Sequence, residues 1–225
     1  CLSENEKQKL PSGKFRVFID SNLTPGELNL AEVRLSGKSQ KEIFFSTNIC
    51  HPSMANNEVS GPVVAMALAK WLAAKKTLRY TYRIIFVPET IGSIAYLAKN
   101  INYLKQHVIA GFNITCVGDD RCFSYVPSRD GKTLSDKVAL HTLKNTDLNF
   151  IRYSWLDRGS DERQFNSFGV EIPMTVLSRT KFGNYPEYHT SLDDFKVVTE
   201  KGLKGGYRVV KKIINLLQNK IIPLS

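Results

Sequence analysis

The sequence predicts an α/β fold in which one mixed sheet lies between helices on both of its faces, a three-layer sandwich. Strand-like apolar runs alternate with stretches whose apolar residues recur every three or four positions, which is typical of βαβ units. Several of these runs are apolar throughout, as expected of strands buried on both faces. With 225 residues, of which 42% are hydrophobic, the chain is long enough for one sizeable core, so a single domain over residues 1–225 is expected.

The start of the chain is expected to form an antiparallel meander. Residues 15–19 are apolar and β-prone, and residues 28–35 alternate apolar and polar side chains. Turn signals at residues 24–27 and 36–39 separate these runs and lead into a strand that includes residues 43–45 and ends near His51. A strand that delivers a histidine to a loop before a helix is where open α/β sheets place their chemistry.

Helices and strands alternate in the rest of the chain. Helices are expected over residues 61–76, 90–106, 134–143 and 200–220, and a further helix is expected to begin at Ser160. Strands are expected over residues 82–88, 108–117, 122–126, 150–155 and 172–177.

The formal net charge of +10 comes from 31 Lys and Arg residues against 21 Asp and Glu residues, and it suits anionic partners. The basic residues are scattered, and the pairs Lys75-Lys76 and Lys211-Lys212 lie on or beside expected helices, where a solvated helix face explains them. No nucleic-acid-binding motif is visible, so nucleic acid is not expected as a partner. An anionic substrate and an anionic polymer stay open as alternatives.

No apolar run approaches the roughly 18 residues that a membrane helix needs, so no membrane-spanning segment is expected. The first residues lack the basic and apolar regions of a signal peptide, and the chain can be a fragment of a longer protein. The four cysteines show no CxxC spacing, and Cys50 and Cys116 lie in apolar runs where reduced, buried thiols are expected. We therefore expect a reducing, cytoplasmic location.

Four loops that follow expected strands carry polar residues. They contain residues 51–57, Glu89, residues 119–120 and residues 185–189. Because the carboxyl ends of the strands lie along one edge of such a sheet, these loops can converge.

Two histidines beside a glutamate form the outline of a metallohydrolase site, since imidazoles bind zinc and a free carboxylate accepts a proton from the attacking water. From spacing alone, His51 and His189 could equally be hydrogen-bonded structural side chains. His107 and His141 have no acidic companion and are expected to be structural.

Five segments match a known family in its own order: residues 50–53, 55–61, 88–93, 158–165 and 185–194. The chain resembles the zinc aminopeptidase family that includes bacterial leucyl aminopeptidases, glutamate carboxypeptidase and glutaminyl cyclases. It is most similar to an uncharacterised bacterial group of aminopeptidase-like proteins associated with polysaccharide biosynthesis. The resemblance implies a central mixed, mostly parallel sheet of about eight strands.

The resemblance also implies roles for individual residues. His51 matches the first zinc-ligand histidine and His189 the last, while Glu89 matches the general base. Tyr188 matches a tyrosine that steadies the tetrahedral oxyanion.

Three expected carboxylate ligands are replaced by neutral residues. Asn57 stands where the family has the aspartate that bridges two metals, and Thr90 and Thr115 stand at two further ligand positions. Two zinc ions would then lack compensating negative charge. The resemblance therefore implies a single zinc ion, held weakly by the two histidines and Asn57.

Four charged residues near the same loops are candidates for substrate binding: Arg158, Asp161, Glu162 and Arg163. Asp161 and Glu162 could hold a substrate amine, and helix capping with surface ion pairing explains all four as well. Asp193 and Asp194 could cap the last helix.

The first hypothesis is a zinc-dependent aminopeptidase-like hydrolase that cleaves an amide bond in a small peptide or an acylated amino sugar. The second is a binding module that keeps the fold, has weakened or lost catalysis and acts in polysaccharide biosynthesis. Binding of an anionic polymer ranks last. No membrane partner is expected, and the sequence gives no oligomeric state.

Overall fold

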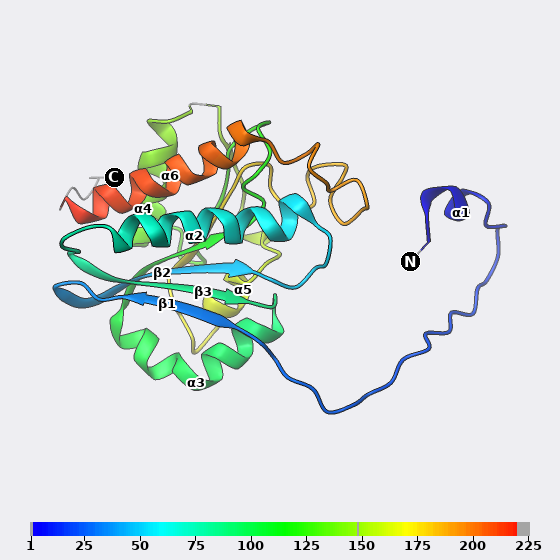
Figure 1. Cartoon of the computed structure of the whole chain (residues 1–225), viewed down its shortest axis with the longest axis horizontal. Coiled ribbons are helices and arrows are strands. Elements are labelled where there is room, and N and C mark those ends of the chain that lie inside the picture. Colours follow the sequence, from blue (N-terminus) through cyan, green and yellow to red (C-terminus); the bar gives the residue numbers. More distant parts are fainter. Residues whose placement is uncertain (1, 148, 220–225) are drawn as a thin grey trace.

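The computed structural model describes residues 2–147 and 149–219 (Figure 1). The strands are β1 (Ala31–Leu35), β2 (Ser39–Asn48), β3 (Tyr80–Val87), β4 (Val108–Ile114), β5 (Ser124–Val126), β6 (Ile151–Arg152) and β7 (Met174–Ser178). The helices are α1 (Glu4–Gln8), α2 (Ser60–Ala73), α3 (Ile91–His107), α4 (Leu134–Lys144), α5 (Glu162–Phe165) and α6 (Glu200–Gln218). A π-helical turn, η1 (Ala55–Val59), precedes α2, and a 3-10 turn, η2 (Trp155–Asp157), follows β6.

The described strands form one sheet with the order β1-β3-β2-β4-β7-β5-β6. The central strands β3, β2, β4 and β7 are parallel, whereas β1 and β5 pair antiparallel with β3 and β7. The predicted α/β class with a mixed, mostly parallel sheet is confirmed. The described residues form a 7-stranded sheet where about eight strands were expected.

Consecutive side chains of the central strands fill the two faces of the sheet. Ile43 and Phe45 of β2 belong to the apolar cluster shared with α2, α4 and α6. Phe44, between them, points to the other face, where its ring lies 6.2 Å from that of Tyr96 in α3 and 5.1 Å from that of Phe165 in α5. This alternation follows from strand geometry and produces the three layers. Figure 1 shows α2 and α6 on one side of the sheet and α3 on the other.

The expected N-terminal meander is wrong. Residues 15–19 form no strand, and residues 2–30 make an exposed arm that leads away from the sheet (Figure 1). Strand β1 does form, but it pairs with β3 and not with β2. A β-prone run becomes a strand only where a neighbour offers free backbone groups, and propensity alone does not supply that neighbour.

Other differences concern the ends of elements. The strand expected over residues 150–155 is shorter and comprises only β6. The chain turns into η2 after it, because the Ser154 hydroxyl accepts the backbone N–H of Leu156 and caps this turn. The strand expected to reach residue 117 ends at Ile114, and Cys116, with φ of 50°, turns the chain. The last helix ends at Gln218 with Asn219 as its C-cap, and the expected end at residue 220 lies outside the described residues.

The helix expected to begin at Ser160 begins instead at Glu162, after Asp161 at its N-cap, and no side-chain cap is present there. None of the helices in residues 2–147 and 149–219 combines the length and the apolar character that a membrane crossing requires.

Candidate functional site

The loops that follow β2 and β7 bring two predicted metal ligands together at the carboxyl edge of the sheet. The imidazole rings of His51 and His189 have centroids 4.8 Å apart and an interplanar angle of 38°. These strands run parallel through the centre of the sheet, so their carboxyl ends share one edge. The fold therefore explains why two distant histidines face each other.

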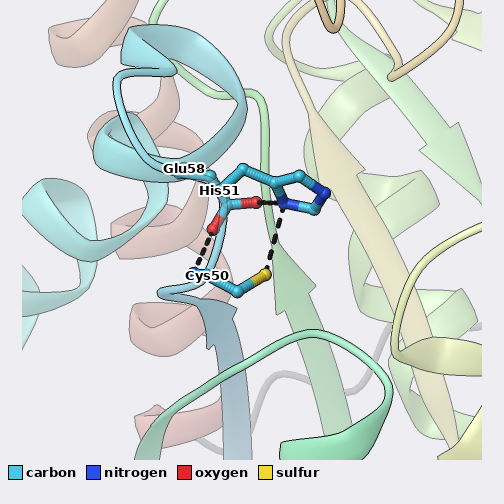
Figure 2. A group of neighbouring side chains, drawn as sticks. All are labelled: Cys50, His51 and Glu58. Atoms are coloured by element: carbon cyan, nitrogen blue, oxygen red, sulfur yellow. Dashed lines mark hydrogen bonds and ion pairs between the residues drawn. The ribbon is translucent and has the colours of Figure 1, made fainter. Parts of the chain in front are cut away.

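Glu58 contacts His51, although the predicted set of site residues omits it. Its Oε1 lies 2.6 Å from Nδ1 of His51, and its Oε2 accepts a hydrogen bond from the backbone N–H of Cys50 at 2.8 Å (Figure 2). The η1 turn brings the buried Glu58 back to the end of β2. The sequence signal for this contact is a carboxylate seven residues after a histidine.

The short contact between His51 and Glu58 is a hydrogen bond and does not leave space for a metal between the two atoms. Two donors bound tetrahedrally to zinc at about 2.1 Å lie roughly 3.4 Å apart, whereas Nδ1 and Oε1 are separated by 2.6 Å. A neutral His51 that donates Nδ1–H to Glu58 keeps its Nε2 as an acceptor, and Figure 2 shows this second nitrogen pointing away from Glu58 and Cys50. Carboxylates commonly orient metal-binding histidines in this way.

Cys50 completes a group of three possible metal ligands, since donor atoms of Cys50, His51 and Glu58 lie within 4.8 Å of one another. Its Sγ lies 3.2 Å from Nδ1 of His51 and accepts the backbone N–H of Glu89 at 3.1 Å. Partial burial of the sulfur raises the pKa of the Cys50 thiol to about 12. The sulfur is therefore a protonated thiol near neutral pH unless a cation binds it.

Asn57 is buried in η1, and its side-chain oxygen has no hydrogen-bond partner among the described residues. The backbone of Asn57 is held on both sides: its N–H donates to Oδ2 of Asp193 at 3.1 Å, and its carbonyl accepts the Thr115 hydroxyl at 3.4 Å. A buried amide oxygen without a donor is costly, so it favours a ligand or an ordered water at this position. This free oxygen is compatible with the predicted role of Asn57 as a metal ligand.

Asp193 does not cap the last helix, because the side chain of Thr199 makes that cap. Asp193 is buried and joins the loop after β7 to η1. Its Oδ1 accepts the backbone N–H of Asn56 at 2.6 Å, and its Oδ2 accepts the N–H of Asn57 at 3.1 Å and the hydroxyl of Tyr185 at 3.0 Å. These bonds fix the two histidine-bearing loops relative to each other.

Glu89 lies directly after β3, beside the loop that carries His51. Its Oε1 accepts a hydrogen bond from Nδ2 of Asn48 at 3.2 Å, and the same amide donates to the Ser160 hydroxyl at 3.2 Å. The predicted general base is therefore held by a buried amide at the end of β2.

Tyr188 stacks on His189 with ring centroids 3.9 Å apart. Partial burial and the nearby imidazole of His51 lower the pKa of His189, which favours the neutral, metal-binding form. Burial raises the pKa of Tyr188, so its phenol stays protonated and can donate a hydrogen bond.

Asp161 and Glu162 are both 0% exposed and hold the loops around them. Oδ1 of Asp161 accepts the backbone N–H of Thr90 at 2.7 Å and the hydroxyl of Ser93 at 2.9 Å, while its Oδ2 has no partner among the described residues. Oε1 of Glu162 accepts the N–H of Gly159 at 2.7 Å. Burial raises the pKa of Asp161 to about 7 and also raises the pKa of Glu162. A direct contact of either carboxylate with a substrate amine stays a prediction.

The two candidate arginines lie on the surface in different places. Arg163 bridges two loops of the site, since its Nε donates to the Ser160 carbonyl at 3.2 Å and its Nη2 to the Thr90 hydroxyl at 3.1 Å. Arg158 packs over the ring of Trp155 in η2 at 4.9 Å. Substrate binding by either arginine stays a prediction.

Strained backbone is concentrated in the loops of this site. Four non-glycine residues there have positive φ: Ser53 (63°), Thr90 (65°), Cys116 (50°) and His189 (57°). Such conformations cost about 1 kcal/mol or more each and persist where the surrounding structure enforces them, which is common at functional sites.

Comparison with known proteins places these features in a family. Residues 6–220 match a family described as a domain of unknown function, DUF4910. The chain belongs to this family. A curated relative from Clostridium acetobutylicum, named for polysaccharide biosynthesis and for an aminopeptidase-like domain, is 35% identical over 218 residues, which are 97% of this chain and 50% of the relative. The chain thus spans about half the length of that relative.

Solved structures confirm the predicted resemblance to the zinc aminopeptidases and glutaminyl cyclases. A crystal structure of a candidate peptidase from Clostridium acetobutylicum has a TM-score of 0.86 at 34% identity and covers 97% of this chain and 51% of its own chain. The zinc aminopeptidase BSAP from Bacillus subtilis has a TM-score of 0.69 at 16% identity, with coverage of 84% and 49%. A glutaminyl cyclase from an Acidobacteriales bacterium has a TM-score of 0.70 at 18% identity, with coverage of 86% and 74%. The last two likenesses show the fold alone.

Proposed function

We propose that this aminopeptidase-like chain hydrolyses an amide bond with the help of one zinc ion. The observation that carries the proposal is the facing pair His51 and His189, with Nε2 of His51 kept free by the hydrogen bond from Nδ1 to Glu58. Glu89, the predicted base, lies beside the same loop.

The donor set fits one zinc ion better than two. Two imidazoles and the unpartnered oxygen of Asn57 leave a fourth position open, as catalytic zinc sites require. Thr90 and Thr115 supply no carboxylate for a second ion, and the Thr115 hydroxyl already donates to the Asn57 carbonyl. A two-metal site would have too little negative charge.

Two side chains of the protein would carry out the remaining steps of catalysis. Bound zinc would supply Lewis-acid polarisation of the scissile carbonyl and a lower pKa for water. Glu89 would accept a proton from the attacking water and return it to the leaving amine. Tyr188, whose phenol stays protonated, would donate a hydrogen bond to the developing oxyanion.

The proposed substrate is a small peptide or an acylated amino sugar. The name of the Clostridium acetobutylicum relative links that protein to polysaccharide biosynthesis, which supports an amino-sugar amide as the substrate class for this chain. We place the reaction in the cytoplasm, a proposal supported by Cys50, Cys116 and Cys122 being free thiols.

A second candidate function is a binding module with weakened catalysis. Asn57 in place of a carboxylate favours it, because a neutral amide holds zinc less strongly than an aspartate does. The two functions differ in turnover and share the fold.

Metal analysis and two variants test the proposal. Protein purified without added zinc should contain about one equivalent, and His51→Ala should lose it. Glu89→Gln should keep the zinc and lose hydrolysis of acylated amino sugars or peptide amides. No zinc, even after zinc is supplied, would overturn the metal site. Zinc with no hydrolysis of any amide would favour the binding module.

A further inference from the structure

A basic pocket lies at the amino edge of the sheet, opposite the candidate site. Its lining residues lie where β2 and β3 begin and where α2 and α6 end. These ends of the four elements lie at the left of Figure 1. Its volume is about 530 Å³, and its polar lining includes Lys38, Lys75, Thr77, Arg79, Asn215 and Asn219. An adjoining cavity of about 350 Å³ shares Lys38 and Lys75 and adds Lys76.

Among the described residues, the pocket gathers positive charge that no neighbouring acidic side chain compensates. Neither cavity has an acidic residue in its lining. Within residues 2–147 and 149–219, the side chains of Lys38, Lys75, Lys76 and Arg79 form no ion pair. Like charges held close together repel one another, so an anion in this pocket would be favoured by all four.

Backbone hydrogen bonds hold the segments that carry Lys38 and Arg79 beside each other. The N–H of Lys38 donates to the Leu78 carbonyl at 2.8 Å, and the N–H of Ser39 donates to the Arg79 carbonyl at 2.9 Å. Gly37 allows this close approach, because a Cβ at that position would overlap the Tyr80 carbonyl. The turn that carries Lys38 is therefore pinned against the start of β3.

The Lys75-Lys76 pair also differs from the expected solvated helix face. Helix α2 ends at Ala73, so both lysines lie in the connection to β3. Lys75 belongs to the lining of both cavities, and its Nζ lies 4.3 Å from the centre of the neighbouring Trp71 ring.

Neutral donors complement the cations. The Thr77 hydroxyl and the amides of Asn215 and Asn219 belong to the same lining. The side-chain oxygen of Gln218 accepts the Arg79 backbone N–H at 2.8 Å, which ties α6 to this end of β3. Cations combined with hydroxyl and amide donors are the groups that recognise phosphate oxygens.

We propose that this pocket binds a phosphate-bearing anion, and that a diphosphate group is the class that fits it. The volume is within the range of small-molecule sites and exceeds the space that a single phosphate needs. A diphosphate can reach cations on both sides, with Lys38 and Arg79 on the strand side and Lys75 at the end of α2. Free pyrophosphate and a nucleoside diphosphate share this chemistry.

Titration of the metal-free protein tests the proposal. Calorimetry in a chelating buffer measures pyrophosphate binding, and in a Trp155→Phe background the fluorescence of Trp71 reports on its contact with Lys75. We expect saturable binding that weakens about tenfold in Lys38→Met and in Lys75→Met, since each removes a charge-assisted contact. A second titration with a nucleoside diphosphate shows whether the neutral lining adds affinity.

Lys99→Met and Lys137→Met are the matched controls, because both lysines are exposed and lie outside the pocket. Each removes one charge and should change affinity less than about twofold. No saturable binding of pyrophosphate, or equal losses in the control variants, would overturn the proposal. The measurement needs no zinc and no turnover, so its failure would leave the proposed hydrolase untouched.

Discussion

The two edges of the sheet are built differently. At the carboxyl edge, loops carry strained non-glycine backbone at Thr90 and His189, and buried polar atoms of Asn57 and Asp161 lack partners among the described residues. At the amino edge, the connections over residues 36–38 and 74–79 contain no non-glycine residue with positive φ. They carry instead a group of lysines and an arginine around an open pocket.

This difference separates two ways of preparing a ligand site. The carboxyl edge holds strained backbone and buried polar atoms without partners in a fixed geometry. Such a geometry suits chemistry that depends on the placement of a few atoms. At the amino edge, the main feature is electrostatic repulsion between basic side chains around an open pocket, which suits reversible binding of an anion. Substitutions should therefore affect stability strongly at the first edge and weakly at the second.

The largest expected effect concerns the packing of α6 against the carboxyl edge. A Cβ on Gly202 would overlap the backbone oxygen of Gly118 and lie 2.5 Å from that of Asp119. Backbone atoms cannot move aside cheaply, so Gly202→Ala should lower the free energy of unfolding by about 3 kcal/mol. Urea denaturation measures this change.

Gly205→Ala is the matched control in the same helix. Its added Cβ would meet first the end of the Arg179 side chain at 3.1 Å, which can shift. Because alanine also gains roughly 1 kcal/mol of helix propensity over glycine, the net change should stay within about 1 kcal/mol. Similar losses in both variants would show that α6 does not rest on the Gly118 backbone.

The next effect is the pH dependence contributed by Asp161. Its pKa is raised by burial to about 7, above the ordinary value of 3.8. Between about pH 4 and pH 7 the folded state therefore binds more protons than the unfolded state, so this carboxyl reduces stability as pH rises. Relative to wild type, Asp161→Asn should therefore become steadily more stable as the pH rises from 4 to 8.

Thermal and urea unfolding across this pH range measure the gain, and Asp130→Asn is the control because Asp130 is exposed. A constant difference between Asp161→Asn and wild type at all pH values would mean that Asp161 is ionised in the folded protein throughout. That result would place a cation beside its free oxygen.

The elements that could be predicted from the sequence are those buried in the core. The alternating apolar periods predicted the central strands and α2, α3, α4 and α6, because burial on both faces of a parallel sheet leaves a strong pattern. The strand predicted over residues 15–19 did not form, since a strand depends on a pairing partner that composition does not reveal.

In the candidate site, the resemblance identified His51 and His189, which the structure brings together. It did not identify Glu58, because its contact with His51 depends on the return path of the η1 turn. Asp161 bonds the backbone of Thr90, and the sequence could not show that Asp161 and Glu162 are both buried.

A smaller effect at the carboxyl edge is expected from Glu58→Gln, which alters the hydrogen bonding of His51. A glutamine can accept the Nδ1–H of His51 through its oxygen only by turning its NH₂ group toward the backbone N–H of Cys50. One of the two contacts is then lost, and zinc affinity should fall about tenfold. Competition with a fluorescent zinc chelator measures the affinity.

Glu187→Gln is the control for that experiment. Glu187 lies on the same loop as His189 and pairs with Arg121, but it does not touch a histidine nitrogen in the described contacts. It should leave zinc affinity within about twofold of wild type. If Glu58→Gln also leaves affinity unchanged while the protein stays folded, Glu58 does not orient a metal ligand.

The smallest expected effect belongs to the amino edge. Lys38→Met and Lys76→Met each remove an exposed cation that forms no ion pair in the described part of the chain, so each should change the free energy of unfolding by less than about 0.5 kcal/mol. The sign should be stabilising at low salt, because removing one cation relieves repulsion among the others, and the gain should disappear as salt screens the pocket. Urea denaturation at low and high salt measures both. A clear destabilisation at either salt concentration would show that these lysines support the fold, and the amino edge would then resemble the carboxyl edge.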